Sequence, residues 1–159
     1  SETIYGYGGD DILTGGANNS GNHILDGGDG NDTLDGGAWN DVLLGGAGRD
    51  SLVGGIGTDV FRFMTVQDSD SVMDTIADFS GAQGDRIDLS YIDANPFVNG
   101  DQAFVFSTSG LTGVVGQVSF DNAYNGFTMV HTDLNGDAIP DMNIVLVGYQ
   151  TLVATNFYL

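Results

Sequence analysis

The sequence predicts an all-β fold, in which a right-handed parallel β-roll over residues 1–62 is continued by a β-sandwich or meander cap over residues 63–159, as one elongated domain. Three observations lead to this prediction. A nine-residue pattern repeats six times in tandem between Gly6 and Arg62. The segment before Phe63 holds 17 of the 26 glycines. After Phe63 the pattern changes to short alternating runs, which are typical of ordinary strands.

The repeat has the form G-G-x-G-x-D-x-U-x, where U is a large apolar residue, a pattern typical of calcium-binding parallel β-rolls. Its copies read GYGGDDILT, GGANNSGNHILD, GGDGNDTLD, GGAWNDVLL, GGAGRDSLV and GGIGTDVFR. The second copy has three inserted residues (18–20), and His23 stands where the others have Asp. The glycine half should curl so that carbonyl oxygens point inward, and the x-U-x half should form a short strand whose middle side chain lies in the core.

Two repeats should make one turn of the roll, so odd and even repeats should lie on opposite edges. Stacked aspartates would then form one column from Asp11, Asp32 and Asp50, opposite a second from His23, Asp41 and Asp59. One curl supplies about half of the six to eight oxygens that Ca²⁺ takes, so two stacked curls should share each ion. Stacked carboxylates also repel one another. The sequence therefore predicts several calcium ions and a roll that folds only when they bind.

The composition excludes several function classes. The net charge is −19, from 22 acidic residues and only three arginines, with no lysine. Such a charge argues against nucleic acid and anionic membrane surfaces as partners. We find no segment apolar enough for membrane insertion, no cysteine, no H-E-x-x-H and no G-x-S-x-G. We therefore expect a monomeric chain that is not itself an enzyme.

Seven strands are predicted from the alternating runs, at residues 60–64, 86–89, 103–107, 117–120, 127–131, 143–147 and 156–158. Clusters of Gly, Asn and Asp separate them as turns. One such cluster, Asp133, Asn135, Asp137 and Asp141, has the oxygen spacing of a compact calcium loop but lacks the Gly and the final acidic residue of an EF-hand. A polar hairpin turn is the alternative.

The segments after the repeats carry a second signature. They read DTIADF (74–79), GDRIDLS (84–90) and IDAN (92–95), followed by GDQAF (100–104), GQV (116–118) and DLNGD (133–137). This signature resembles the C-terminal domain of serralysin-type secreted bacterial metalloproteases, and with the repeats the resemblance covers essentially the whole chain. Similar modules end many type I secreted proteins, including lipases, adhesins and mannuronan epimerases. The resemblance implies an RTX module that binds a ladder of calcium ions and carries an uncleaved C-terminal export signal.

The resemblance also implies the ligands. They are the carbonyls at positions two and four and the Asp of one repeat, with the carbonyls at positions one and three and the Asp of the repeat two further on. The residues implied are Tyr7, Gly9, Asp11, Gly27, Asp29 and Asp32 between repeats one and three; Gly28, Gly30, Asp32, Gly45, Ala47 and Asp50 between three and five; and Gly37, Trp39, Asp41, Gly54, Ile56 and Asp59 between four and six. The last half-sites, at Gly46, Gly48 and Asp50 and at Gly55, Gly57 and Asp59, lack a following repeat; Asp68 and Asp74 are the nearest matches to the aspartates that close such sites in the family.

Together these inferences predict a secreted, calcium-binding RTX module that folds outside the cell and is exported by type I secretion machinery. The tail, Asn156, Phe157, Tyr158 and Leu159, resembles the family's export signal, an acidic residue followed by three apolar ones, with Asn in place of the acid. The parent would be a secreted hydrolase, protease or polysaccharide-modifying enzyme. The alternative is a calcium-dependent polysaccharide-binding module of a secreted enzyme or adhesin, with Trp39 and the tyrosines as candidate stacking residues, although the few cationic residues argue against an anionic polymer.

Overall fold

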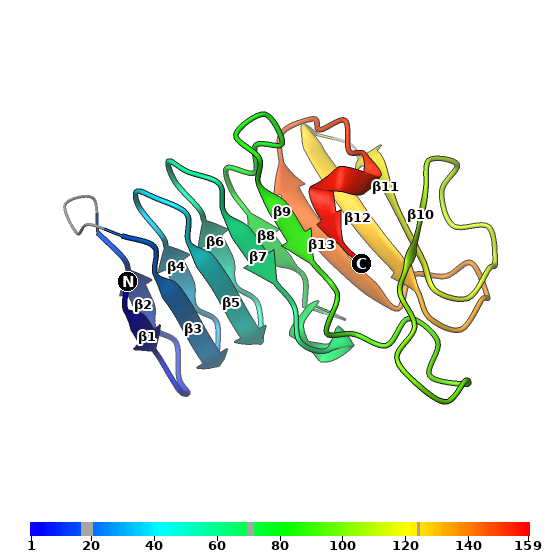
Figure 1. The fold of residues 1–159 in the computed structure, drawn as a ribbon, viewed down its shortest axis with the longest axis horizontal. Helices are drawn as coiled ribbons and strands as arrows, with labels where there is room; N and C mark the ends of the chain where they lie inside the picture. The colour runs from blue at the N-terminus through cyan, green and yellow to red at the C-terminus, as the bar shows by residue number, and fades with distance from the viewer. Residues whose placement is uncertain (17–20, 70–71, 124) are drawn as a thin grey trace.

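The chain folds into two β-sheets that are built alternately as it advances (Figure 1). The structure is a computed structural model and describes residues 1–16, 21–69, 72–123 and 125–159. The inserted residues 18–20 of the second repeat lie outside the described residues. Apart from strands, the described residues form two short 3-10 helices, η1 (Val66–Ser69) and η2 (Ala154–Asn156). Within them no helix has the length and hydrophobicity that a membrane crossing requires.

The first sheet contains six strands, all paired in parallel. In spatial order they are β1 (Thr3–Tyr5), β3 (Ile24–Asp29), β5 (Val42–Ala47), β7 (Val60–Arg62), β9 (Arg86–Asp88) and β14 (Phe157–Tyr158). The second sheet contains eight, in the order β10 (Val105–Ser107), β11 (Gln117–Ala123), β12 (Phe127–Asp133), β13 (Met142–Val147), β8 (Asp74–Ile76), β6 (Ser51–Val53), β4 (Thr33–Asp35) and β2 (Ile12–Thr14).

The core of the roll is a file of the apolar position-eight residues. They are fully buried from the second repeat to the sixth, as Leu25, Leu34, Leu43, Leu52 and Phe61. Because successive strand side chains point to opposite faces, only this residue of each x-U-x strand reaches the interior. Odd repeats place their strands in the second sheet and even repeats in the first. The all-β parallel roll with two repeats per turn is thus confirmed.

The parallel roll continues past the last glycine repeat. Strand β8 pairs in parallel with β6, and β9 with β7, so that Ile76 and Ile87 extend the buried file. Both segments keep the second half of the repeat, D-x-U-x, as Asp74–Ala77 and Asp85–Asp88. Strand β8 was not among the predicted strands, because three residues without a glycine curl give no alternating run. The division at residues 62 and 63 therefore remains an interpretation of composition.

The cap is a meander only in part. Strands β11, β12 and β13 pair antiparallel in sequence order, as predicted, whereas β10 pairs in parallel with β11. Strand β13 then pairs in parallel with β8, which joins the meander to the roll as one continuous sheet. At the far end of the first sheet, the C-terminal strand β14 adds to β9. The cap thus covers the strand edges that the last turn of the roll would otherwise expose.

Candidate calcium centres

Two columns of side chains run along the two edges of the roll. On the odd edge, the Oδ1 atoms of Asp32, Asp50 and Asp74 each accept the backbone N–H of the aspartate one turn earlier, at 2.7–2.8 Å. On the even edge, Oδ1 of Asp41 accepts the backbone N–H of His23 at 2.6 Å, and Oδ1 of Asp59 accepts that of Asp41 at 2.8 Å. These bonds orient each carboxylate and place it between two turns. The structure therefore brings together both predicted groups of aspartates.

The second oxygen of each carboxylate faces a buried space. The Oδ2 atoms of Asp11, Asp32, Asp41, Asp50, Asp59 and Asp74 are buried without a hydrogen-bond partner. Burying a carboxylate oxygen without a hydrogen-bond donor costs free energy, so a bound cation would stabilise each of these oxygens. Within the described residues, no three histidine or acidic side chains form a group that could hold a metal ion. A cation between two turns would thus need backbone oxygens as well.

The glycine curls supply such oxygens. Among the described residues, the position-four carbonyls of Gly9, Gly30 and Trp39 accept no backbone hydrogen bond. Each packs directly against the glycine of the next turn, where an added Cβ at Gly30, Gly48 or Gly57 would overlap it. Carbonyl and carboxylate oxygens are the ligands that Ca²⁺ prefers. The residues present therefore fit a ladder of calcium ions, whose positive charge would neutralise the stacked carboxylates.

The carbonyls predicted at positions two and three are also placed between turns, but they accept backbone hydrogen bonds there. Tyr7 and Gly37 accept from Asp29 and Ile56, both at 2.9 Å. The carbonyls of Asp29, Ala47 and Ile56 accept the N–H groups of Gly9, Gly30 and Trp39, at 2.7–2.8 Å. A carbonyl oxygen has two lone pairs, so these atoms can hold a neighbouring turn and still face a cation. The ligand set of each ion stays a prediction.

Trp39 keeps the backbone conformation of the glycine that it replaces. Its φ is 86°, in the left-handed region, where Tyr7 (φ 71°) also lies. For a residue with a bulky side chain this conformation costs on the order of 1–2 kcal/mol, which the flanking turns must offset. The indole lies exposed beside Ile56, over a shallow apolar cavity. Trp39 can therefore offer its carbonyl to the even column while its ring faces solvent.

Aspartates outside the repeats close both columns. Asp74 continues the odd column by accepting the N–H of Asp50, and its role as a calcium ligand stays a prediction. Asp68 lies close by, but its oxygens accept the N–H groups of Met64 and Thr65 and the Thr65 hydroxyl. It therefore caps the turn that leads into η1, and its role as a ligand stays a prediction.

Sequence reasoning missed the end of the even column. Asp85 accepts the N–H of Asp59 through Oδ1 and that of Ser80 through Oδ2, at 3.0 and 2.8 Å. Asp78 accepts the N–H groups of Gly54 and Gly55. The spacing from Asp59 to Asp85 breaks the period of the repeats, which hid this relation. The D-x-U-x pattern shared by residues 74–77 and 85–88 is the signal that could have found Asp85.

Burial raises the pKa values of three column aspartates. It raises the pKa of Asp74 to about 8, and those of Asp50 and Asp59 to about 6, from an ordinary value of 3.8. Neighbouring carboxylates raise these pKa values further, whereas the accepted N–H groups lower them. The pKa of Asp85 is raised for the same main reason. Protons and calcium ions would therefore compete for the same oxygens.

The even column begins with a weaker position. His23 is buried in place of an aspartate, with Nδ1 3.1 Å from Oδ1 of Asp41. Asn22 would not restore the missing charge, because its side chain is a neutral amide, whose oxygen accepts the N–H of Asn40 at 3.3 Å. An imidazole is a poor ligand for a hard cation. The site between repeats two and four thus lacks one of its two carboxylates.

We expect the two columns to bind calcium unequally. His23→Asp should add one ion to the stoichiometry and raise the melting temperature in calcium, because affinity follows ligand charge count. Asp32→Asn, which removes a carboxylate shared by two sites of the odd column, should lower both. Calcium titration of the decalcified chain by calorimetry and native mass spectrometry measures the count. An unchanged count in His23→Asp would show that the wild-type site between repeats two and four already fills.

Position five carries a second ladder that runs along both edges. On the even edge the side-chain oxygen of Asn40 accepts the N–H of Thr58 at 2.9 Å. On the odd edge those of Asp10 and Asn31 accept the N–H groups of Asn31 and Arg49, at 2.8 and 3.1 Å. These side chains reach toward the following turn, whereas the position-six aspartates reach toward the preceding one. Each pair of neighbouring turns is therefore linked in both directions.

The loop around Asp133 is built as a hydrogen-bonded turn. Asp133 is buried and accepts the N–H groups of Asn135 and Gly136 through Oδ1 and of Ala138 through Oδ2, at 2.6–3.2 Å. Asp141 accepts from Leu134 and from the Asn135 amide. Since all four carboxylate oxygens of Asp133 and Asp141 already have N–H donors, the geometry favours the hairpin turn over a calcium loop.

Comparisons with known proteins agree with this geometry. The family model described as Peptidase M10 serralysin C terminal matches residues 25–159. The model of the RTX calcium-binding nonapeptide repeat, which spans four copies, matches residues 2–20. No curated protein sequence matches the chain.

Solved structures share the fold. The solution structure of the AlgE6R3 subunit from the Azotobacter vinelandii mannuronan C5-epimerase matches with a TM-score of 0.64 and 30% identity, over 94% of this chain and 78% of that one. The AlgE6R2 subunit of the same enzyme matches with a TM-score of 0.67 and 30% identity, over 98% of this chain and 89% of that one. Both are similar to the described chain along nearly its whole length.

Proposed function

Because the chain belongs to the serralysin C-terminal family and carries RTX calcium-binding repeats, we propose that it is the non-catalytic module of a secreted protein that folds on calcium outside the cell and bears the type I export signal. The observation that carries this proposal is the pair of columns of buried, unpartnered Oδ2 oxygens. A chain with these columns is poorly stable without a divalent cation.

Calcium concentration would act as the trigger for folding. If the sites have affinities typical of extracellular modules, on the order of 10⁻⁴ to 10⁻³ M, they are empty in cytosol and filled outside the cell. The chain then crosses the export machinery unfolded and folds as it emerges. Folding outside would also oppose backward movement.

The export signal is assigned to residues 156–159. In the folded chain Asn156 and Phe157 are buried, and Phe157 and Tyr158 form β14 on the edge of the first sheet. The Asn156 side chain accepts the N–H of Val153 at 3.0 Å. The tail is thus packed as a strand in the folded chain, so the machinery would have to read it before folding.

Removing residues 156–159 should abolish type I export. The full-length parent and its truncated form would be expressed in a host that carries a type I system, and the extracellular fraction would be measured. Asn156→Asp, which restores the family's acidic residue, is the matched control and should be exported at least as well as the wild type. Normal export of the truncated parent would refute this assignment, whereas circular dichroism in calcium reports separately whether the truncated chain still folds.

A further inference from the structure

The imidazole of His23 occupies the place that a carboxylate oxygen takes in other repeats. A Cβ added to the first glycine of repeats one, four and six would lie 2.7–2.8 Å from Oδ2 of the position-six aspartate of the same repeat. A Cβ added at Gly15, the first glycine of repeat two, would lie 2.9 Å from Nδ1 of His23. His23 is only 2% exposed. The even column thus presents a buried nitrogen ligand where the other turns present oxygen.

Oxygens of the next turn lie beside this nitrogen. Oδ1 of Asp41 is 3.1 Å from Nδ1 of His23. The carbonyl oxygen of Gly36 packs against Gly15 and accepts no backbone hydrogen bond within the described part of the chain. Two ligands of a tetrahedral ion with bonds of about 2.0–2.1 Å lie roughly 3.3 Å apart. The spacing of Nδ1 and the carboxylate oxygen therefore suits a small ion as well as it suits a hydrogen bond.

Repeat two offers calcium fewer oxygens than the other repeats do. A Cβ added at the second glycine of repeats three, five and six would overlap the position-two carbonyl oxygen of the turn before. At Gly37, in repeat four, the nearest atom is instead the carbonyl carbon of Gly16, at 3.2 Å. The Gly16 carbonyl thus departs from the regular arrangement, and the carboxylate at position six is missing. Because calcium takes six to eight oxygens, this site suits it less than it suits a four-coordinate ion.

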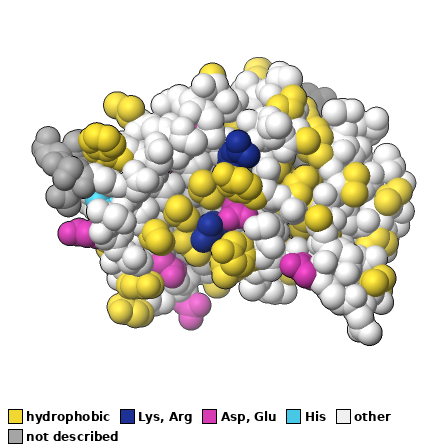
Figure 2. Space-filling model, viewed as in Figure 1, with side chains coloured by type: hydrophobic (Ala, Val, Ile, Leu, Met, Phe, Trp, Pro, Cys, Tyr) yellow, Lys and Arg dark blue, Asp and Glu magenta, His cyan; other side chains and the backbone are white. Residues whose placement is uncertain are grey.

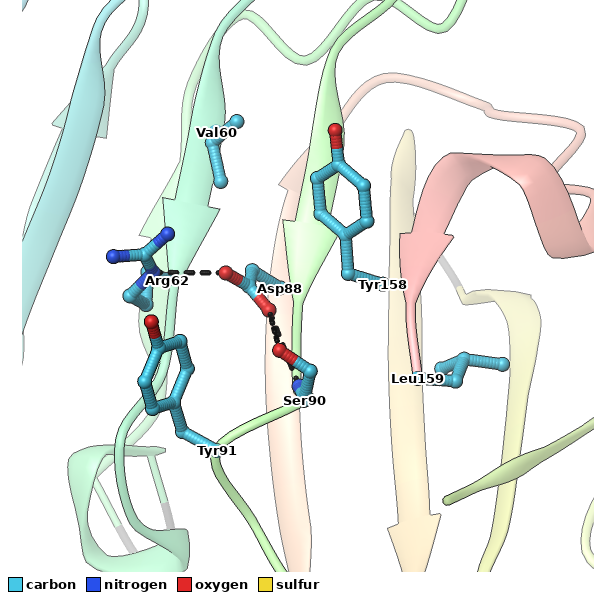
Figure 3. A pocket seen from close by; sticks show the side chains of 7 residues that line it. All are labelled: Val60, Arg62, Asp88, Ser90, Tyr91, Tyr158 and Leu159. Carbon is cyan, nitrogen blue, oxygen red and sulfur yellow. Dashed lines mark hydrogen bonds and ion pairs between the residues drawn. The ribbon is translucent and has the colours of Figure 1, made fainter.

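The arginines of the chain do not balance the charge of Asp41, whose Oδ2 is buried without a hydrogen-bond partner. Arg62 and Arg86 lie on the outer face of the first sheet, where Nε of Arg62 donates to Oδ2 of Asp88 at 2.8 Å (Figure 3). Figure 2 shows the basic side chains of this face among hydrophobic ones. Arg49 is exposed on the odd edge. A metal ion between His23 and Asp41 would supply the positive charge that no arginine provides.

We propose that the site between repeats two and four binds a divalent ion of the first transition series, with Zn²⁺ as its representative, in place of Ca²⁺. The neutral imidazole of His23 binds the ion through Nδ1 and keeps its proton on Nε2, while Asp41 and the carbonyl of Gly36 contribute oxygens. Imidazole nitrogen suits Zn²⁺, whereas calcium prefers oxygen. Such a site requires the folded roll, and hence the proposed binding of calcium at the other positions.

Calorimetric titration of the calcium-loaded chain with Zn²⁺ tests this site. At saturating calcium we expect one zinc ion per chain, counted independently by native mass spectrometry. His23→Gln removes the imidazole without adding charge and should weaken zinc binding roughly a hundredfold, because a ligand of the ion is lost. His131→Gln makes the same change at the other histidine of the chain and should leave the affinity within about twofold of the wild type, since the two positions are independent.

His131 offers the competing arrangement, because its Nε2 lies 3.2 Å from Oδ2 of Asp121. Loss of zinc binding in His131→Gln, alone or together with loss in His23→Gln, would therefore overturn the proposal. Absence of zinc binding at saturating calcium would also overturn it, as would complete displacement of zinc by a further excess of calcium. Circular dichroism in calcium shows whether each variant is folded. A chain that folds on calcium but binds no zinc would contradict this site alone and leave the proposed function intact.

Discussion

Removal of calcium should abolish the folded roll. The Oδ2 oxygens of the column aspartates are buried and unpartnered, and carboxylates about 5 Å apart, the spacing of neighbouring strands, repel by roughly 1 kcal/mol per pair even in bulk water. The single row of buried apolar side chains between the sheets of the roll gives a thin core to offset this cost. Far-UV circular dichroism in chelator should therefore show loss of most of the β signal, and millimolar calcium should restore it.

Magnesium provides the control for this experiment. It demands tight octahedral geometry and releases its water reluctantly, so it should restore the fold poorly at the same concentration. A simple screening of the net charge by any divalent ion would instead make the two ions equivalent. A β spectrum with an unchanged melting temperature in chelator would contradict the prediction that calcium ions stabilise the roll.

Without calcium, acid should stabilise the chain. Burial raises the pKa of Asp74 to about 8 and those of Asp50 and Asp59 to about 6. Since the ordinary value of 3.8 applies to the unfolded chain, the folded chain binds more protons between about pH 4 and pH 8, and its stability falls as the pH rises through this window. In chelator, we therefore expect part of the β signal in far-UV circular dichroism, which is lost at pH 8, to return at pH 5.

Calcium should reverse this dependence, because it binds the ionised carboxylates and its affinity must rise with pH. Asp74→Asn keeps the acceptor for the Asp50 N–H but removes the most strongly shifted carboxylate, so it should flatten the pH dependence of the calcium-free chain. Asp101→Asn, at an exposed position, removes the same charge and should leave the slope unchanged. Equal flattening by both variants, or stability that rises from pH 5 to pH 8 without calcium, would contradict the assignment.

The repeats carried enough information to predict the roll and its columns. Asp at position six and a large apolar residue at position eight recur at a fixed period, so the alternation between two edges follows from geometry alone. The outcome at Trp39 was harder to foresee, because only the packing of flanking turns decides whether a bulky residue adopts the glycine conformation. Its φ of 86° shows that the turns prevail over the local preference.

The features of the fold and of the site that the repeats did not predict depend on contacts between residues far apart in the sequence. Asp78 and Asp85 cap the even edge from outside the nine-residue register, and their partners, such as Gly54 and Asp59, lie 24 and 26 residues earlier. The row formed by Arg62, Asp88 and Tyr158 on the outer face of the first sheet could not be predicted either, because these residues meet only through the register of β7, β9 and β14. The pairing of the C-terminal strand with β9 depends on tertiary packing, which no local sequence pattern encodes.

The two ladders of side-chain acceptors make the roll behave as a one-dimensional stack. Every link that they provide joins a turn only to its immediate neighbour, whether through Asp32 to Asp11 or through Asn31 to Asp10. Stability in such a stack is a sum of nearest-neighbour terms, and a defect affects only the interfaces that it touches. His23 therefore weakens one end of one edge without disturbing the rest. The same locality allows turns to be added or lost, and loops to be inserted, without redesigning the molecule.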